Sequence, residues 1–280
     1  MDIAALNPLD RLVAAGQVPH RARLPFVLGV EGVGRAGAQR YVVHGCGVGL
    51  SRAGTLSETV AVPRGALVRV PSGVSDEHAA MVGVSLATAI GVVGLADLKA
   101  GHTALVLGAS GVVGASLCSL LHARGIDVTG QVRSVEHGAA VEANGASVAV
   151  ADTAERLVAA GGVRYDAVLD SLGGEWTSAA IEVAAPRGRV VCYGSSSGPE
   201  TRLVTAQLYR KALTLAGYGG VGQESRVLRR HIREALDALV AGHLRPVIGH
   251  RYPLADAASA WEAMAGPRTG KVLVDISARR

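Results

Sequence analysis

Cysteine and aromatic residues are scarce in this chain of 280 residues, and each shortage excludes a class of protein. The three cysteines, Cys46, Cys118 and Cys192, stand too far apart for a Cys-x-x-Cys metal site or a disulfide framework. Such sparse usage suits a reducing compartment, so we expect a cytoplasmic protein without a bound metal. Aromatic residues make up 3% of the chain, which leaves few rings on which nucleic-acid bases could stack. We therefore expect no nucleic-acid partner.

Long apolar segments are also missing. One run without charged residues, 79–96, only reaches the lower limit for a membrane span and is rich in Gly, Ala, Ser and Thr. It is typical of a buried helix with its turn, so we expect no membrane association. The N-terminus lacks the basic and apolar regions of a secretory signal. Four arginines at helical spacing are interpreted as a solvated helix face, with a polyanion partner as the alternative: Arg226, Arg229, Arg230 and Arg233.

The most informative segment is a short apolar strand that leads through glycines into a helix. Residues 104–107 are followed by Gly108, Gly111 and Gly114, the spacing of a dinucleotide-binding turn. Gly108 permits a tight turn, Gly111 leaves room for phosphates, and Gly114 lets the helix lie close to the sheet. The first amides of that helix lack partners within it and can face an anion. Glycines alone would also fit an ordinary turn, but with strand and helix in place we predict a bound dinucleotide.

From residue 102 onward, β-branched segments alternate with amphipathic ones, which predicts a parallel sheet covered by helices on both faces. Six strands are expected, at residues 104–107, 127–132, 147–150, 166–170, 189–193 and 212–216. Helices are expected at residues 112–124, 135–144, 153–160 and 175–184. This is the pattern of a doubly wound Rossmann sheet in an α/β protein.

Both ends of the chain differ from this pattern. Pro, Gly and short apolar runs over residues 24–70 indicate a small β domain, and residues 244–252 and 271–276 return to that style around a helix at 254–264, capped near Asp256. We infer a discontinuous outer domain. The predicted boundaries are 1–88 for the outer domain, 89–218 for the dinucleotide domain and 219–280 for the return to the outer domain.

Six motifs occur in an order that matches a known family. They are Asn7-Pro8-Leu9-Asp10, residues 24–32, residues 54–60, the glycine turn 108–114, residues 170–174 and Thr269-Gly270-Lys271. Over nearly its whole length the chain resembles the zinc-independent, zeta-crystallin-like quinone oxidoreductases of the medium-chain dehydrogenase/reductase superfamily. The resemblance implies a Rossmann domain that binds NADPH, a GroES-like β domain, truncated here, and a homodimer formed through the sheets.

The residues after the second strand bear on the choice of cofactor. Sites for NAD place an acidic side chain there for the ribose 2′-hydroxyl, whereas a 2′-phosphate requires positive charge and hydrogen-bond donors. This chain has Arg133 and Ser134, with His137 nearby, and no acidic residue before Glu136. Arg133 could pair with the phosphate, or it could be a solvated surface arginine. We favour NADPH over NADH.

The resemblance also implies cofactor contacts at the glycine turn and beyond the carboxyl ends of the strands, where ligands of open α/β sheets bind. The residues concerned are Thr88, Ser110, Gly111, Val112, Val113, Ser171, Leu172, Gly173, Tyr193, Gly194 and Ser195. A hydrogen bond within its own helix explains Thr88 equally well, and a core position is a fair alternative for Tyr193.

A metal-free reductase of this type passes hydride to a small-molecule quinone or to an α,β-unsaturated carbonyl compound (an enone), while hydrogen-bond donors stabilise the oxyanion. The resemblance places Asn7 and Asp10 beside the nicotinamide as candidate catalytic residues, and Asn7 is the first candidate to hold substrate or cofactor. Turn and cap roles are the alternative for both.

Two departures from the family favour other hypotheses as well. Leu12 stands where relatives often have a tyrosine donor, so water or another donor must protonate an enolate. The sequence begins almost at Asn7, without the opening strands that relatives place ahead of it, and a segment that relatives have is missing between Gly34 and Tyr41. We therefore expect a trimmed outer domain with an open pocket. The alternatives are therefore a repurposed enzyme that performs cyclisation or dehydration, and a non-catalytic subunit that binds NADPH.

Overall fold

The computed structural model describes residues 1–18, 25–162, 164–266 and 270–277. The chain divides into two compact units. Unit 1 comprises Met1–Ala87, Gly220–Gly242 and Pro246–Arg280, and unit 2 comprises Thr88–Gly219 with His243–Arg245. The division after residues 87 and 219 lies one residue from each boundary expected from the sequence. Two motif residues, Leu24 and Thr269, lie outside the described residues.

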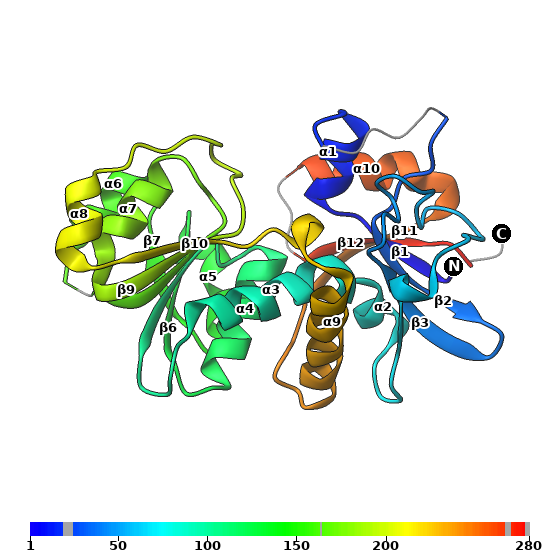
Figure 1. Cartoon of the computed structure of the whole chain (residues 1–280), viewed down its shortest axis with the longest axis horizontal. Helices are drawn as coiled ribbons and strands as arrows, with labels where there is room; N and C mark the ends of the chain where they lie inside the picture. Colours follow the sequence, from blue (N-terminus) through cyan, green and yellow to red (C-terminus); the bar gives the residue numbers. More distant parts are fainter. Residues whose placement is uncertain (19–24, 163, 267–269, 278–280) are drawn as a thin grey trace. The chain divides into compact units, whose positions relative to one another are not determined.

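Unit 2 contains a six-stranded sheet between two layers of helices (Figure 1). Its strands are β5 (Thr103–Leu107), β6 (Asp127–Val132), β7 (Ser147–Val150), β8 (Tyr165–Asp170), β9 (Ala184–Cys192) and β10 (Thr214–Gly217). The order across the sheet is β10-β9-β8-β5-β6-β7, and every neighbouring pair is parallel. The order reverses between β5 and β8, which is the point where open α/β sheets bind ligands.

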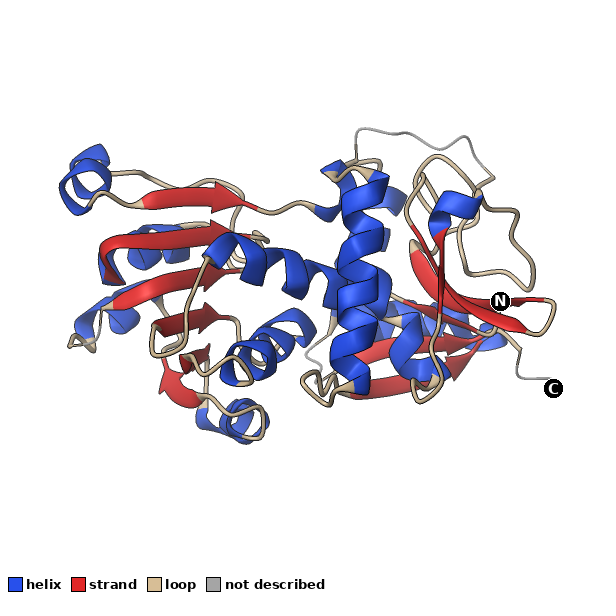
Figure 2. Cartoon of the chain, turned by 60° about the horizontal axis from the view of Figure 1, so that its bottom comes forward, coloured by secondary structure: helices blue, strands red, loops and turns tan. Residues whose placement is uncertain are grey.

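The helices of unit 2 are α3 (Ala87–Ala96), which begins at the last residue of unit 1, α4 (Val112–His122), α5 (Gly138–Glu142), α6 (Ala154–Ala159), α7 (Glu175–Val183) and α8 (Thr205–Lys211). Helix α4 packs on β5 and β6 with α5 beside it, whereas α7 packs on β8 and β9 with α6 and α8 beside it (Figure 2). Strand β5 has four fully buried residues in succession because both faces are covered. The predicted doubly wound α/β fold is confirmed.

Local signals set most of the element ends. Gly125 and Gly145 have positive φ after α4 and α5, and the Thr153 hydroxyl accepts a hydrogen bond from the Arg156 amide at the start of α6. The start of the last strand was predicted wrongly. Ala212 has a φ of 51° and ends α8, so β10 begins only at Thr214.

Unit 1 contains a second six-stranded sheet, made from both ends of the chain. Its strands are β1 (Ile3–Ala5), β2 (Glu31–Ala36), β3 (Gln39–His44), β4 (Leu67–Arg69), β11 (Ile248–Pro253) and β12 (Lys271–Asp275), in the order β11-β12-β1-β2-β3-β4. The β11–β12 pair is parallel and the remaining pairs are antiparallel. A tight turn at Gly37, with a φ of 61°, joins β2 to β3. One short strand, β1, does precede Asn7, where the sequence analysis expected none, and it lies between β12 and β2.

The helices of unit 1 are α1 (Pro8–Ala14), α2 (Asp76–Ala80), α9 (Ser225–Val240) and α10 (Ala257–Ala265), with a π-helical turn, η2 (Val82–Leu86), between α2 and α3. Arg226, Arg230 and Arg233 on α9 are exposed, as expected for a solvated face. Asp256 precedes α10 but makes no side-chain cap bond, contrary to the expectation for it. Among the described helices, none has the length and apolar character needed to cross a membrane.

Candidate active site

The glycine turn of unit 2 lies at the point where the strand order reverses. A Cβ atom at Gly114 would lie 2.4 Å from the Gly108 carbonyl oxygen, so glycine is required there for helix α4 to approach β5. At Gly111 the nearest such contact is 3.4 Å, and the residue is exposed. Gly111 is the N-cap residue of α4 and makes no side-chain hydrogen bond to the first turn. The main-chain amides of Val112, Val113 and Gly114 therefore have no acceptor within the helix. Ser110 beside them is half-buried. The protein itself does not need glycine at position 111, whereas a bound phosphate group would.

Gln131 braces this turn from the neighbouring strand. Its buried side chain accepts a hydrogen bond from the Gly108 amide at 2.9 Å and donates to the Ala151 carbonyl oxygen at 2.5 Å. Its main-chain oxygen accepts from the Ala109 amide at 3.0 Å. The sequence analysis gave Gln131 no role. The only feature of the sequence that could have indicated this role is the presence of a polar residue within an apolar strand.

The predicted recognition site for a 2′-phosphate lies where β6 ends. Arg133 is exposed there, directly after the strand. The hydroxyl of Ser134 and Nδ1 of His137 are 3.0 Å apart, so the structure brings these two predicted residues together. The carboxyl group of Glu136 is fully exposed and lies close enough to Ser134 for a hydrogen bond that lowers its pKa. The site therefore combines a serine and a histidine with an arginine that has no ion pair among the described residues.

The loops after β8 and β9 meet beside the glycine turn. The Ser171 hydroxyl donates to the Leu107 carbonyl oxygen at 2.9 Å, and a Cβ atom at Gly108 would lie 2.6 Å from that hydroxyl. A Cβ atom at Gly173 would lie 2.8 Å from Cα of Ser195, and one at Gly194 would lie 2.7 Å from the Ser171 carbonyl oxygen. Close packing of main chain against main chain thus gathers these predicted residues at one edge of the sheet.

Asp170 holds the first of these loops in place. Its fully buried carboxylate accepts hydrogen bonds from the amides of Leu172 at 2.8 Å and Gly173 at 3.1 Å, and from the Thr177 hydroxyl at 2.5 Å. Asp170 therefore positions Leu172 and Gly173.

Two further predicted cofactor residues are less exposed. Burial raises the pKa of the Tyr193 phenol, whose hydroxyl lies beside the Ser171 side chain and makes no hydrogen bond of ordinary geometry within the described part of the chain. Thr88 is half-buried as the second residue of α3. Tyr193 as a whole is half-buried, and its hydroxyl group is buried.

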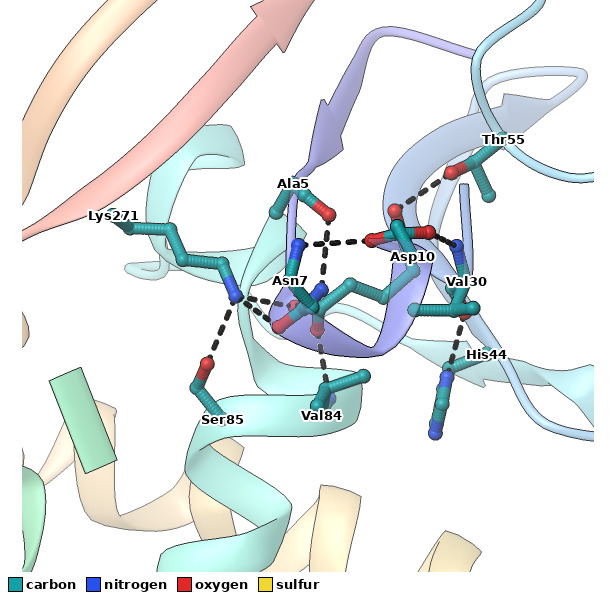
Figure 3. Close-up of polar contacts among 10 residues, drawn as sticks. Ala5, Asn7, Asp10, Val30, His44, Thr55, Val84, Ser85 and Lys271 are labelled. Carbon is teal, nitrogen blue, oxygen red and sulfur yellow. Dashed lines mark hydrogen bonds and ion pairs between the residues drawn. The ribbon is translucent and has the colours of Figure 1, made fainter. Parts of the chain in front are cut away.

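Unit 1 buries a compact polar cluster that consists of Asn7, Glu31, Ser85 and Lys271 (Figure 3). The ammonium group of Lys271 donates to Glu31 Oε1 at 2.9 Å, to Ser85 Oγ at 2.9 Å and to Asn7 Oδ1. The side-chain amide of Asn7 donates to Glu31 Oε1 at 2.8 Å and to the Ala5 carbonyl oxygen at 3.1 Å. Both side-chain hydrogens of Asn7 and all three of Lys271 are therefore used inside the unit.

Asp10 ties the start of α1 to the strand that follows. Its carboxylate accepts hydrogen bonds from the main-chain amide of Asn7 at 2.8 Å and from the main-chain amide of Val30 at 3.0 Å. Burial raises its pKa to about 6, and the two amide bonds and Lys271 oppose that rise. Asp10 is thus a carboxyl group that titrates close to neutral pH while it serves as an anchor.

The π-helical turn η2 is fastened to the polar cluster at two points. Glu31 Oε2 accepts from the Val84 amide at 2.7 Å, and Ser85 accepts from Lys271. On the other side of the turn, a Cβ atom at Gly83 would lie 2.5 Å from Cβ of His44. Nδ1 of His44 lies 2.7 Å from the Val30 carbonyl oxygen (Figure 3). The sequence analysis assigned no role to Glu31, Lys271 or His44, although Glu31 and Lys271 lie within its motifs.

No three His, Cys, Asp or Glu side chains converge as a metal site requires anywhere in the described ranges. The family model for zinc-binding dehydrogenases nevertheless matches residues 144–274. That segment includes the sheet from residue 147 onward and extends to β12.

Known proteins match nearly the whole chain. The quinone oxidoreductase of Thermus thermophilus, whose structure was also solved in complex with NADPH, is 31% identical, with 98% of this chain and 89% of that chain covered and a TM-score of 0.83. The quinone oxidoreductase of Pseudomonas aeruginosa is 29% identical over 94% of this chain and 86% of its own length. A mycobacterial quinone oxidoreductase is 25% identical, with 98% and 89% covered and a TM-score of 0.82. The chain belongs to the quinone oxidoreductase-like group of the medium-chain dehydrogenase/reductase family.

Proposed function

We infer that this chain is an NADPH-dependent oxidoreductase that transfers hydride to a quinone or an enone. The observation that carries this inference is the glycine turn at the β5–β8 switch point. Its helix starts without a side-chain cap, and its central glycine has no steric reason to be a glycine. Relatives named as quinone oxidoreductases, one of them solved with NADPH, support the same reading.

The residues of unit 2 fit the charged parts of NADPH. The free amides of Val112, Val113 and Gly114 suit a diphosphate, because helix N-termini bind anions. The guanidinium of Arg133 and the hydroxyl of Ser134 suit the 2′-phosphate, with His137 beside them. The loops at Ser171–Gly173 and Tyr193–Ser195 remain our proposal for the ribose and nicotinamide. When bound, NADPH supplies the hydride, and these residues orient it.

We assign Asn7 and Asp10 a positioning role in unit 1. Their polar groups already bind Lys271, Glu31 and two main-chain amides, so they fix the start of α1 and leave no free side-chain hydrogen for a substrate. We therefore propose that other residues of the unit make the direct contact with substrate.

A homodimer through the β10 edge fits the exposed apolar side chains there. Strand β10 is an outer strand of the sheet and carries Leu215, which is 41% exposed. In the preceding helix α8, Tyr209 is 69% exposed, and Val204 at its N-cap is 47% exposed. An apolar sheet edge needs cover, and a second copy supplies it symmetrically. We also propose a cytoplasmic location, because Cys46, Cys118 and Cys192 are all free thiols.

The test is calorimetry with NADPH, followed by NADPH oxidation against a panel of quinones and enones. We expect binding and turnover of at least one member of the panel. Cofactor binding without turnover would favour a non-catalytic subunit, and product formation without any nucleotide would favour a repurposed enzyme. Absence of NADPH binding would overturn the proposal.

A further inference from the structure

Ser134 precedes the short helical turn η3 (Val135–His137), but its hydroxyl group makes no cap hydrogen bond to that turn. A serine at this position ordinarily accepts a hydrogen bond from a main-chain amide of the first turn. Here Oγ of Ser134 lies 3.0 Å from Nδ1 of His137, and the main-chain oxygen of Ser134 accepts from the His137 amide at 3.2 Å. The hydroxyl group therefore interacts with a side chain and not with the turn, and both residues are half-buried.

Two charged side chains of the same segment, Arg133 and Glu136, are exposed. The hydrogen bond from Ser134 lowers the pKa of the Glu136 carboxyl group, and its own main-chain amide and the charge of His137 act in the same direction. Helix α5 packs on η3, and its one ionisable side chain, Glu142, lies at the end of the helix. The Ser134 hydroxyl is therefore within reach of two acceptors, Nδ1 of His137 and the carboxylate of Glu136.

The charge on His137 determines where the hydrogen of the Ser134 hydroxyl points. When the ring is neutral, Nδ1 either accepts from the hydroxyl group or donates to it. When the ring is charged, both of its nitrogens carry hydrogens, so Nδ1 only donates and Ser134 Oγ accepts. The hydroxyl hydrogen is then released for another acceptor. Protonation of the ring therefore adds a positive charge and frees a hydrogen-bond donor at the same place.

Resting on the function proposed above, we propose that His137 and Ser134 form a proton-linked recognition site for the 2′-phosphate of NADPH, built entirely within unit 2. Binding of the phosphate dianion draws a proton onto the His137 ring, because a nearby anion favours the charged form. Ser134 then donates its hydrogen to a phosphate oxygen instead of to Glu136, whose negative charge opposes the phosphate. NADH lacks this phosphate, so its binding does not depend on the proton. The preference for NADPH over NADH therefore increases as the pH falls.

Calorimetric titration of wild type with NADPH and with NADH between about pH 7 and 9 tests this proposal. The 2′-phosphate is a dianion across this range, since the second pKa of a phosphate monoester is about 6. We expect the dissociation constant for NADH divided by that for NADPH to fall by roughly threefold or more as the pH rises. At about pH 7.5, titration in buffers of different ionisation enthalpy should show that NADPH binding takes up about 0.4 proton and NADH binding none.

Two substitutions separate the titrating group from the competing carboxylate. His137→Asn keeps a hydrogen-bonding side chain beside Ser134 but does not titrate, so the ratio should stay level with pH and the proton uptake should disappear. Glu136→Gln removes the competing charge and should strengthen NADPH binding by roughly threefold while NADH binding is unchanged. The matched controls are His250→Asn and Glu142→Gln, at exposed positions, and both should bind the two nucleotides as wild type does.

The results distinguish this proposal from the function on which it rests. A wild-type protein that binds NADPH with a ratio independent of pH would overturn the proton-linked site and uphold NADPH binding. A pH dependence that persists in His137→Asn would also overturn it, because the titrating group would then lie elsewhere. A wild-type protein that does not bind NADPH would overturn both proposals. The proton uptake of wild type requires no variant, so it tests the proposal even if a variant does not fold.

Discussion

Single residues determine the electrostatics of both units, and the burial of charged groups costs more free energy in unit 1. Lys271 and Glu31 are 4% and 0% exposed and lie 2.9 Å apart. Taking both charges out of water costs several kcal/mol each, and only the full set of hydrogen bonds around them offsets that cost. Such a pair stabilises little relative to an apolar core but fixes geometry, here that of α1, β2 and η2.

Arg133→Ala should weaken NADPH far more than NADH, because only the 2′-phosphate loses a charged partner. We expect a loss of roughly tenfold or more for NADPH and less than about twofold for NADH, since hydrogen bonds to charged groups contribute about 1.5–3 kcal/mol. Calorimetry with both nucleotides measures this difference. Equal losses for the two cofactors would show that the 2′-phosphate lies elsewhere.

Asp10 should make the stability of the protein depend on pH. Its pKa is raised from 3.8 to about 6 in the folded chain, so the folded state binds the proton more tightly than the unfolded state. The resulting stabilisation is present below about pH 4 and is lost as the pH rises to about 6, by about 3 kcal/mol in total.

The Asp10→Asn variant lacks this titration. We therefore expect the free energy of unfolding of wild type minus that of Asp10→Asn to decrease between pH 4 and 6 and to be level above 7. Urea unfolding of both proteins across this range gives the difference. A difference that stays constant with pH would rule out the raised pKa.

At the scale of elements, substitutions in the glycine turn can distinguish its role in packing helix α4 on the sheet from its role in cofactor binding. Substitution of Gly111 by leucine should abolish binding of NADPH and NADH alike while the melting temperature changes little, because a Cβ atom there meets only ordinary contacts. Gly114→Ala, in contrast, should destabilise unit 2, since its Cβ atom would lie 2.4 Å from the Gly108 carbonyl oxygen. Thermal melts and calorimetry of the two variants test the contrast. A Gly111→Leu protein that binds NADPH normally would refute the assigned phosphate position.

The same turn shows how far sequence reasoning reaches. Gly108, Gly111 and Gly114 are close together in the chain, so their spacing alone predicts strand, turn and helix. Lys271 and Glu31 are 240 positions apart, and a lysine in an apolar strand does not reveal which buried carboxylate it meets. The contacts of His44 with Val30 and Gly83 could not be predicted either, because both partners are distant in sequence.

At the scale of the whole molecule, the exposed edge at β10 predicts the oligomeric state. Sedimentation should give twice the chain mass of 28.5 kDa for wild type. Leu215→Arg should shift the protein to the monomer, because a charge buried in an apolar contact is costly. Val240→Arg changes a side chain that is 57% exposed on α9 and should leave the dimer intact. A wild-type protein that sediments at 28.5 kDa would refute the β10 dimer.

The position of β1 between β2 and β12 affects the order of events during synthesis. The six strands of unit 2 are complete once the ribosome has made residue 217, and they come from one continuous segment. The centre of the other sheet requires Ile3–Ala5 to pair with Lys271–Asp275, which are translated after all six strands of unit 2. Because domains generally fold as units while the chain emerges, the Rossmann half should form first. Strand β1 must then wait, with one edge unpaired and open to chaperones, until β12 has been made.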